Sequence, residues 1–184
     1  MVYHGRFMVN HYHVVLDLLT VSIDHIEQNI AYDRMKYWVY HVLDDAILIH
    51  VDDPKLAEYQ KLDCRLLVLP DEPVDQNIGI MLYLKLNAIM ENRMVVTDIE
   101  VSSRQGDNAS YLHSVGENLG QYFSKDGWWS DSRPLWTHAR IDRTDKIVSL
   151  ERSPEWIEHE LAWGDPSTNK RDAVITAFPK DENK

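Results

Sequence analysis

The sequence has a single cysteine, which excludes a protein stabilised by disulfides within the chain. It also has no glycine- or serine-rich linker that would separate two domains. Cys64, the one cysteine among 184 residues, lies in the apolar run "DCRLLVLP", where we expect a buried structural thiol rather than a catalytic nucleophile. One thiol without a disulfide framework is typical of proteins in a reducing compartment.

Long hydrophobic runs are also missing. The longest apolar stretches, residues 37–51 and 78–90, are interrupted by polar side chains such as His41, Asp44 and Lys85. Neither approaches the roughly 18 uninterrupted apolar residues of a transmembrane helix. The first residues, "MVYHGRFMVNHYH", contain neither the basic segment nor the continuous apolar segment of a secretory signal. We therefore expect a cytoplasmic protein that does not span a membrane.

Positive charge is scarce. The formal net charge is −11 and the isoelectric point is about 5.2, and no run is rich in lysine or arginine. Because such a chain repels polyanions on average, direct binding to nucleic acid or to an anionic membrane is not expected. An acidic protein can instead imitate nucleic acid and block a DNA-binding partner, which is the weakest functional alternative for this chain.

The remaining composition is that of an ordinary globular protein, with 44% hydrophobic and 27% charged residues. No repeat or low-complexity segment marks a domain boundary. We therefore predict a single α+β domain over residues 1–184. Its expected parts are an N-terminal arm (1–10), a helical region (11–43), a mixed body (44–178) and a frayed tail (179–184).

The first predicted element is a long amphipathic helix over residues 11–32. Its apolar side chains recur at spacings of three and four residues, at Leu16, Leu19, Ile23, Ile26 and Ile30. These spacings place them on one helix face. We expect this face to pack against the body of the protein, with a dimer interface as the alternative.

The body is predicted to hold a buried central helix packed on a mixed or antiparallel sheet. Asp75 is the expected N-cap of this helix, which is apolar nearly all the way round. Residues 46–51 and 64–70 are expected strands, and residues 93–103 form another with alternating side chains. Later segments predict a hairpin at "HARIDRTDKIVSL", a short helix at "SPEWIEHELAWG" and a last strand at "DAVITAFP".

Two acids one residue apart, Asp98 and Glu100, end the strand "RMVVTDIEVSS". Side chains at alternate strand positions share a face, so these acids are predicted to lie on the same face as Met94 and Val96. Two carboxylates about 6–7 Å apart at the backbone can jointly hold Mg²⁺ or Mn²⁺. The ordinary alternative is a solvated strand end.

This acid pair suggests a metal-dependent hydrolase or phosphodiesterase as an alternative function. Asp98 and Glu100 would be the metal ligands, and His113 or Lys85 would assist, with Asp107 as a further candidate ligand. The sequence by itself assembles no third ligand. For Lys85 we weigh an ammonium that reaches the surface against an internal ion pair with an acid on a neighbouring strand.

Tryptophan is concentrated in one part of the chain, since five of the six lie between residues 128 and 163. The loop "DGWWSDSRPLW" contains Trp128, Trp129, Arg133 and Trp136. Tryptophan and arginine are enriched at protein interfaces, although such rings also fill cores. The leading hypothesis is therefore a non-enzymatic acidic interaction protein that binds a protein partner, or itself, through this loop. Trp156 and Trp163 lie seven residues apart and are expected in the core.

Overall fold

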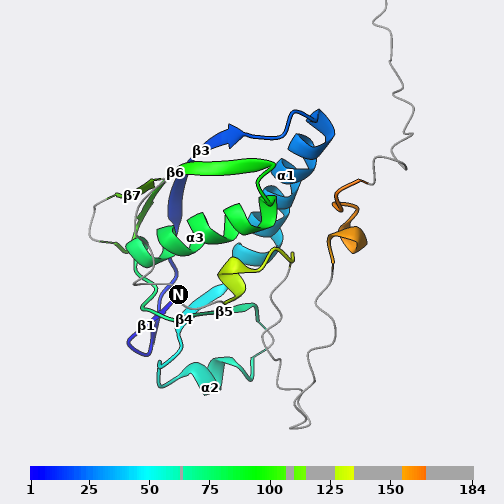
Figure 1. Ribbon diagram of the computed structural model, residues 1–184. Coiled ribbons are helices and arrows are strands. Elements are labelled where there is room, and N and C mark those ends of the chain that lie inside the picture. The colour runs from blue at the N-terminus through cyan, green and yellow to red at the C-terminus, as the bar shows by residue number, and fades with distance from the viewer. Residues whose placement is uncertain (63, 107–109, 115–126, 135–154, 165–184) are drawn as a thin grey trace, which may run out of the picture.

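The computed structural model describes residues 1–62, 64–106, 110–114, 127–134 and 155–164. Its elements are α-helices combined with small antiparallel and parallel sheets, so the predicted α+β class is confirmed (Figure 1). Figure 1 also shows helix α3 lying between the larger sheet on one side and the smaller parallel sheet on the other.

The larger sheet is antiparallel and has the strand order β3–β6–β7. Its strands are β3 (Tyr12–Thr20), β6 (Met94–Ser103) and β7 (Tyr111–Ser114). One face of this sheet packs on α3 (Asp75–Met90), the predicted central helix, most of whose side chains are buried. The burial of α3 nearly all the way round agrees with its apolar sequence.

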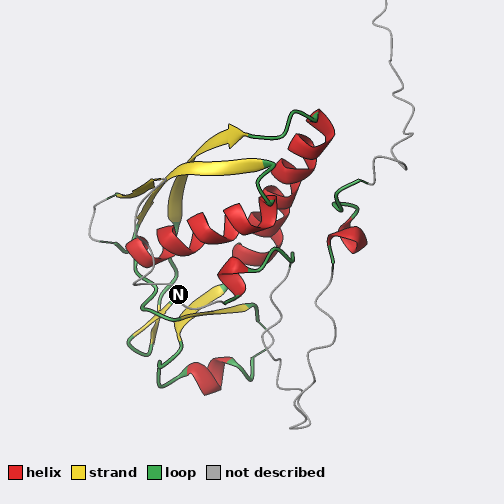
Figure 2. Ribbon diagram, viewed as in Figure 1, coloured by secondary structure: helices red, strands yellow, loops and turns green. Residues whose placement is uncertain are grey.

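A second helix, α1 (His25–Trp38), meets α3 and continues as a π-helical turn, Val39–Leu43 (Figure 2). It begins where the Asp24 carboxylate accepts a hydrogen bond of 2.8 Å from the backbone N–H of Ile26. This contact satisfies one of the free N–H groups of the first turn. Trp38 ends α1 and is fully buried against the core.

The smaller sheet pairs β4 (Ile47–His50) in parallel with β5 (Leu66–Leu69), and helix α2 (Leu56–Tyr59) lies in the connection between them. Both strands were predicted from their short apolar runs. The N-terminal residues form a hairpin of β1 (Val2–Tyr3) and β2 (Arg6–Phe7), and β1 contacts β4. The predicted arm is therefore folded onto this sheet.

The predicted helix over residues 11–32 is wrong in its first half, because residues 12–20 are strand β3. The side chains alternate between half-buried (Tyr12, Val14, Leu16, Leu18) and exposed (His13, Val15, Asp17, Leu19). Such a period of two is that of a strand with one face covered. Pairing with β6 decides between the two periods, and only the later part of the predicted helical region is helical.

Two further predictions differ from the structure, and three others lie outside the described residues. Asp75 is the first residue of α3 rather than its N-cap, which is Val74, and its carboxylate instead accepts a 2.6 Å hydrogen bond from the Ser103 hydroxyl. The segment "SPEWIEHELAWG" contains a 3₁₀ turn, Trp156–His159. The predicted hairpin, last strand and frayed tail lie outside the described residues.

Candidate functional site

The tryptophan-rich loop packs into the core through its first two rings. Trp128 is 3% exposed and Trp129 is 8% exposed. The Trp128 indole donates a 2.8 Å hydrogen bond to the backbone oxygen of Val68 and stacks against Trp38 with the ring centroids 6.2 Å apart. These contacts satisfy the indole N–H while burying its ring, so the core alternative describes both residues. Trp136 lies outside the described residues.

Lys85 of α3 binds the backbone of this loop. Its side chain is 0% exposed, and the ammonium donates hydrogen bonds to the backbone oxygens of Trp128 (3.2 Å), Asp131 (2.6 Å) and Arg133 (3.0 Å). Neither predicted environment is observed, because the ammonium is bound by three carbonyls rather than by water or a carboxylate. Burial lowers the pKa of Lys85 to about 7, and the negative charge of Asp131 opposes that shift.

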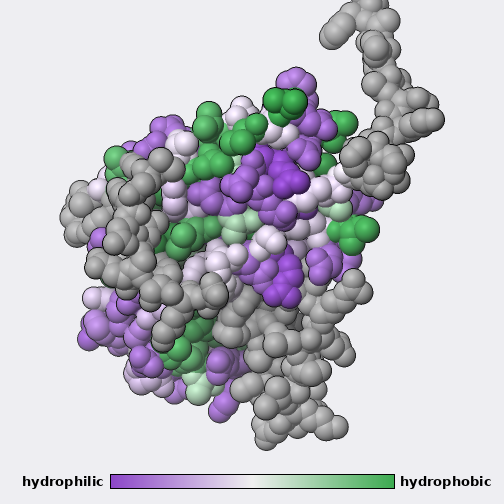
Figure 3. All heavy atoms as spheres, in the orientation of Figure 1, coloured by the Kyte–Doolittle hydropathy of each residue, from purple (hydrophilic) through white to green (hydrophobic). Residues whose placement is uncertain are grey.

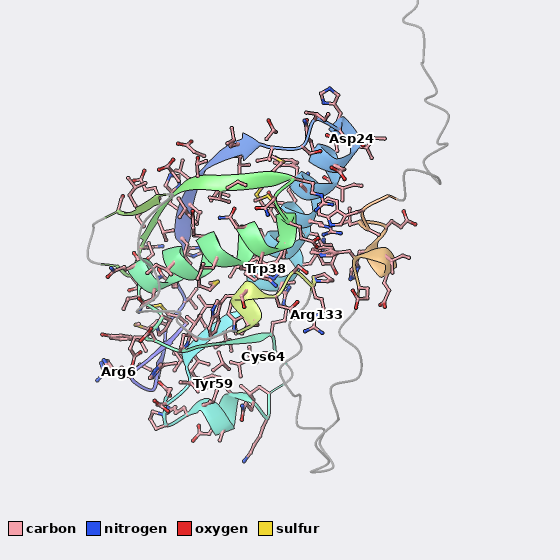
Figure 4. The ribbon with its side chains drawn as sticks, in the orientation of Figure 1. Arg6, Asp24, Trp38, Tyr59, Cys64 and Arg133 are labelled. Atoms are coloured by element: carbon pink, nitrogen blue, oxygen red, sulfur yellow. The ribbon has the colours of Figure 1, made fainter. Side chains whose placement is uncertain are left out.

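The outer end of the loop carries an ion pair. The Nε atom of Arg133 lies 2.8 and 3.0 Å from the two carboxylate oxygens of Asp131. Partial burial alone would raise the pKa of Asp131, but the hydrogen bonds from Arg133 hold it below its ordinary value. Arg133 is exposed at the surface end of the loop, whereas Trp38 lies deeper in the protein (Figure 4). Among the four loop residues predicted to bind a partner, Arg133 is the one that the structure shows at the surface.

The later tryptophan segment, residues 155–164, docks on a buried arginine that the sequence did not single out. Arg34 in α1 is 2% exposed and stacks over Trp163 at 3.6 Å and Trp156 at 4.8 Å from the ring centroids. Its Nη1 lies 3.0 Å from Glu91, which also accepts a 2.8 Å hydrogen bond from Trp163. Burial lowers the pKa of Arg34 to about 10, although Glu91 counteracts this. Trp156 is buried as predicted, and Trp163 is half-buried.

The acid pair on β6 is placed by a β-bulge. Asp17 pairs with Asp98, but the next residue, Leu18, pairs with Val96, so Thr97 is an extra residue in β6. An inserted residue reverses which positions face the core. Met94 and Val96 are buried before the bulge, and Ile99 and Val101 are buried after it. Asp98 and Glu100 share a face of β6, as predicted. The prediction that Met94 and Val96 lie on the same face is wrong, because the bulge turns the two acids to the opposite face.

For the other predicted catalytic residues, the structure describes the strand register of His113 and the position of Lys85. His113 pairs with Ile99, rather than with Asp98 or Glu100. Lys85 lies in the core on α3, which covers the opposite face of the sheet. Asp107 lies outside the described residues. Among the described residues, no group of three or more histidine, cysteine, aspartate or glutamate side chains is placed to hold a metal ion.

The strand register brings a different set of residues together around the acids. The face of the large sheet turned away from α3, which we call the outward face, carries His13, Val15, Asp17, Leu19, Val95, Asp98, Glu100, Ser102 and Leu112. Val15, Leu19 and Leu112 are 44, 55 and 59% exposed. None of these positions holds a lysine or arginine. Figure 3 shows hydrophobic atoms at the molecular surface over β3, interspersed with hydrophilic ones.

The outward face is therefore a mixed apolar and acidic surface formed by three strands. Exposed apolar side chains grouped together, rather than scattered singly, are a feature of interaction surfaces. Among the described residues, no helix has both the length and the apolar character needed to cross a bilayer. No protein-family model matches the chain, and no curated protein matches it significantly.

Proposed function

We propose that this chain is a non-enzymatic interaction protein that binds a protein partner through the outward face of the β3–β6–β7 sheet. The observation that carries the proposal is the juxtaposition of exposed Val15, Leu19 and Leu112 with the carboxylates of the same face. A sheet provides a rigid platform, so a partner would bind there without an ordering cost in this part of the chain.

The chemistry of the face favours a partner that is both apolar and basic. Burial of Leu19 and Leu112 would supply free energy in proportion to the apolar area removed from water. Asp17 and Glu100 add negative charge to this face, and none of the face positions named above holds a lysine or arginine. Lysine or arginine side chains on the partner would complement these charges and accelerate the encounter.

The tryptophan-rich loop keeps a different role in this proposal. Trp128 and Trp129 stabilise the side of α3 opposite the large sheet, and Lys85 fixes the loop backbone beside them. Their burial supports a structural contribution to the platform rather than direct contact with a partner. Arg133 remains a candidate contact at the exposed end of this loop.

A metal-dependent hydrolase is the alternative, and one observation favours it. The register places Asp17 directly opposite Asp98 in the neighbouring strand, although no three such side chains among the described residues converge on one metal position in this conformation. Mg²⁺ or Mn²⁺ prefers such oxygen ligands. An acidic mimic of nucleic acid, the weaker alternative, would present the carboxylates of the outward face to a DNA-binding protein.

The proposal is tested by site-specific photo-crosslinking in extracts of the native organism. A photoreactive amino acid at Leu112 is expected to yield a covalent adduct with a discrete protein, whereas the same group at exposed Tyr40 of the π-helical turn is the control. The identified protein is then purified for direct binding measurements.

Charge reversal makes the test specific for the face. Asp98→Lys with Glu100→Lys is expected to weaken binding of the identified protein by roughly tenfold or more, because like charges then face each other. The matched control is Asp33→Lys with Asp52→Lys, which changes the net charge equally at exposed positions elsewhere. Equal adducts at Leu112 and Tyr40, or equal effects of the two double variants, would contradict the proposal.

A further inference from the structure

Among the residues that the structure describes, strand β3 is an edge strand of the large sheet. The sheet order β3–β6–β7 leaves β3 paired on one side only. The backbone N–H of Arg104 donates a hydrogen bond to the backbone oxygen of His11 (3.0 Å), and that of Val21 donates to Arg93 (2.9 Å). The odd-numbered residues of β3 therefore direct their backbone N–H and C=O groups toward β6. Alternate residues point the opposite way, so the even-numbered residues from Tyr12 to Thr20 present their N–H and C=O groups at the edge. No backbone hydrogen bond from another described residue reaches them.

The sequence of this edge strand, "YHVVLDLLT", lacks proline and lysine, two of the residues that natural proteins use to prevent edge pairing. The strand is nine residues long. The bulge residue, Thr97, belongs to β6, so the free side of β3 stays regular. A long regular edge of this kind is a template for another strand. The opposite edge strand, β7, has four residues.

The core-facing side chains of β3 are also incompletely buried. Val14, Leu16 and Leu18 face the core, yet each is only half-buried. A strand added beside them would cover part of their exposed surface. The apolar edge therefore gains both backbone hydrogen bonds and burial when another strand pairs with it.

We propose that β3 pairs antiparallel with β3 of a second copy of this chain, on a two-fold axis at Val15, to form one continuous six-stranded sheet. This inference goes beyond the proposed function, because it uses the edge of the sheet rather than its face and names the partner as the same chain. An isologous pairing of this kind closes as a dimer.

The register follows from the edge geometry and from charge. In a symmetric pair of β3 strands, the even-numbered residues of one copy must exchange backbone hydrogen bonds with even-numbered residues of the other. The two-fold axis can then lie at Val15, Leu16 or Asp17 if most of each strand is to be paired. Centring on Asp17 would place two carboxylates against each other, and centring on Leu16 would place Asp17 against Val15. Centring on Val15 instead places His13 opposite Asp17 of the second copy, twice, in the closer non-hydrogen-bonded positions.

The Val15 register satisfies the free backbone groups of most of the edge. Tyr12 pairs with Leu18 of the second copy, and Val14 pairs with Leu16, each twice by symmetry. Four such pairs exchange about eight hydrogen bonds. The pairing also places the outward faces of the two copies side by side, which doubles the mixed apolar and acidic surface.

Cysteine crosslinking tests this register directly. In a Cys64→Ser background, Val15→Cys is expected to form a covalent dimer under mild oxidation, because the two residues directly face each other at a spacing that a disulfide can bridge. Asp17→Cys is the matched control, two residues along on the same face, and should remain largely uncrosslinked. Crosslinking at Asp17→Cys in place of Val15→Cys would overturn the register and with it the proposal.

Sedimentation velocity over a concentration series supplies a second measurement on the full chain. Val15→Lys is expected to raise the dimer dissociation constant roughly tenfold or more, because two ammonium groups then meet on the axis. The new lysine lies beside Glu100 in its own chain, so the monomer keeps its fold. Leu19→Lys adds the same charge near the end of the paired segment and should change the constant by less than about threefold. A wild-type protein that stays monomeric at all concentrations would overturn the inference.

The two proposals fail separately. Partner binding that the Asp98→Lys and Glu100→Lys variant retains, while Val15→Cys still forms the covalent dimer, overturns the outward-face proposal alone. Loss of the Val15→Cys dimer with partner binding intact overturns the edge pairing alone.

Discussion

The stability of this protein should rise with pH above neutrality because of one side chain, Lys85. Its ammonium is buried beneath the tryptophan-rich loop, and burial lowers its pKa from an ordinary value of 10.5 to about 7. Below about pH 7 both the folded and the unfolded chain hold the proton, and the full cost of burying the charge is present. Between about pH 7 and 10.5 the folded chain releases the proton while the unfolded chain keeps it, so the free energy of unfolding increases.

The size of this effect follows from the pKa difference. A shift of one pKa unit corresponds to about 1.4 kcal/mol, so the whole window from 7 to 10.5 corresponds to roughly 5 kcal/mol. Roughly 2–3 kcal/mol of this falls between about pH 6 and pH 9, which is experimentally convenient. Lys85→Met keeps most of the length of the side chain and removes the titrating group, so it should lack this contribution.

The assay is urea unfolding of both proteins at several pH values, followed by tryptophan fluorescence. Other titrating groups affect both proteins alike, so the informative quantity is the wild-type free energy of unfolding minus that of Lys85→Met. We expect this difference to increase by roughly 2–3 kcal/mol from about pH 6 to pH 9. A difference that stays constant within about 0.5 kcal/mol would refute the reasoning, because it would mean that the ammonium titrates as it does in water.

Two further predictions concern the loop and the acid pair. Trp128→Ala should lower the free energy of unfolding by about 3–5 kcal/mol, since it removes a buried ring. Trp128→Phe should cost about 1–3 kcal/mol, largely through the lost hydrogen bond to Val68, and a cost below about 1 kcal/mol for Trp128→Ala would contradict the core assignment. Under the interaction proposal, millimolar Mg²⁺ or Mn²⁺ should leave the melting temperature within about 1 °C. A rise of several degrees that Asp98→Asn with Glu100→Gln abolishes would favour the hydrolase alternative instead.

The parts of the fold that could be predicted are those whose sequence allows one period only. The central helix is apolar over too many consecutive positions for a strand of ordinary length, and the runs at 46–51 and 64–70 are short and bounded by turn residues. The segment 11–20 allows two periods. Leu16 and Leu19 fit a helix, whereas Val14, Leu16 and Leu18 fit a strand, and only the partner strand β6 decides between them.

The buried cations show a second limit of the sequence. Lys85 was recognisable as a charge in an apolar helix, but its acceptors are backbone oxygens of residues 128–133, which carry no side-chain signature. Arg34 gave no signal at all. Its partners lie on segments more than 50 residues away, and stacking on Trp156 and Trp163 depends on how those segments return to α1.

The bulge residue Thr97, rather than the alternation of side chains along β6, determines which face carries Asp98 and Glu100. With strict alternation, Asp98 and Glu100 would share the face of Met94 and Val96 and would point into the core against α3. Burying two unpaired carboxylates there would cost several kcal/mol each, or would force them to take up protons. The bulge at Thr97 removes this conflict, because it turns Ile99 and Val101 inward and both acids outward. The change from apolar to acidic along β6 is therefore compatible with an apolar core, and the same bulge creates the surface on which the proposed function depends.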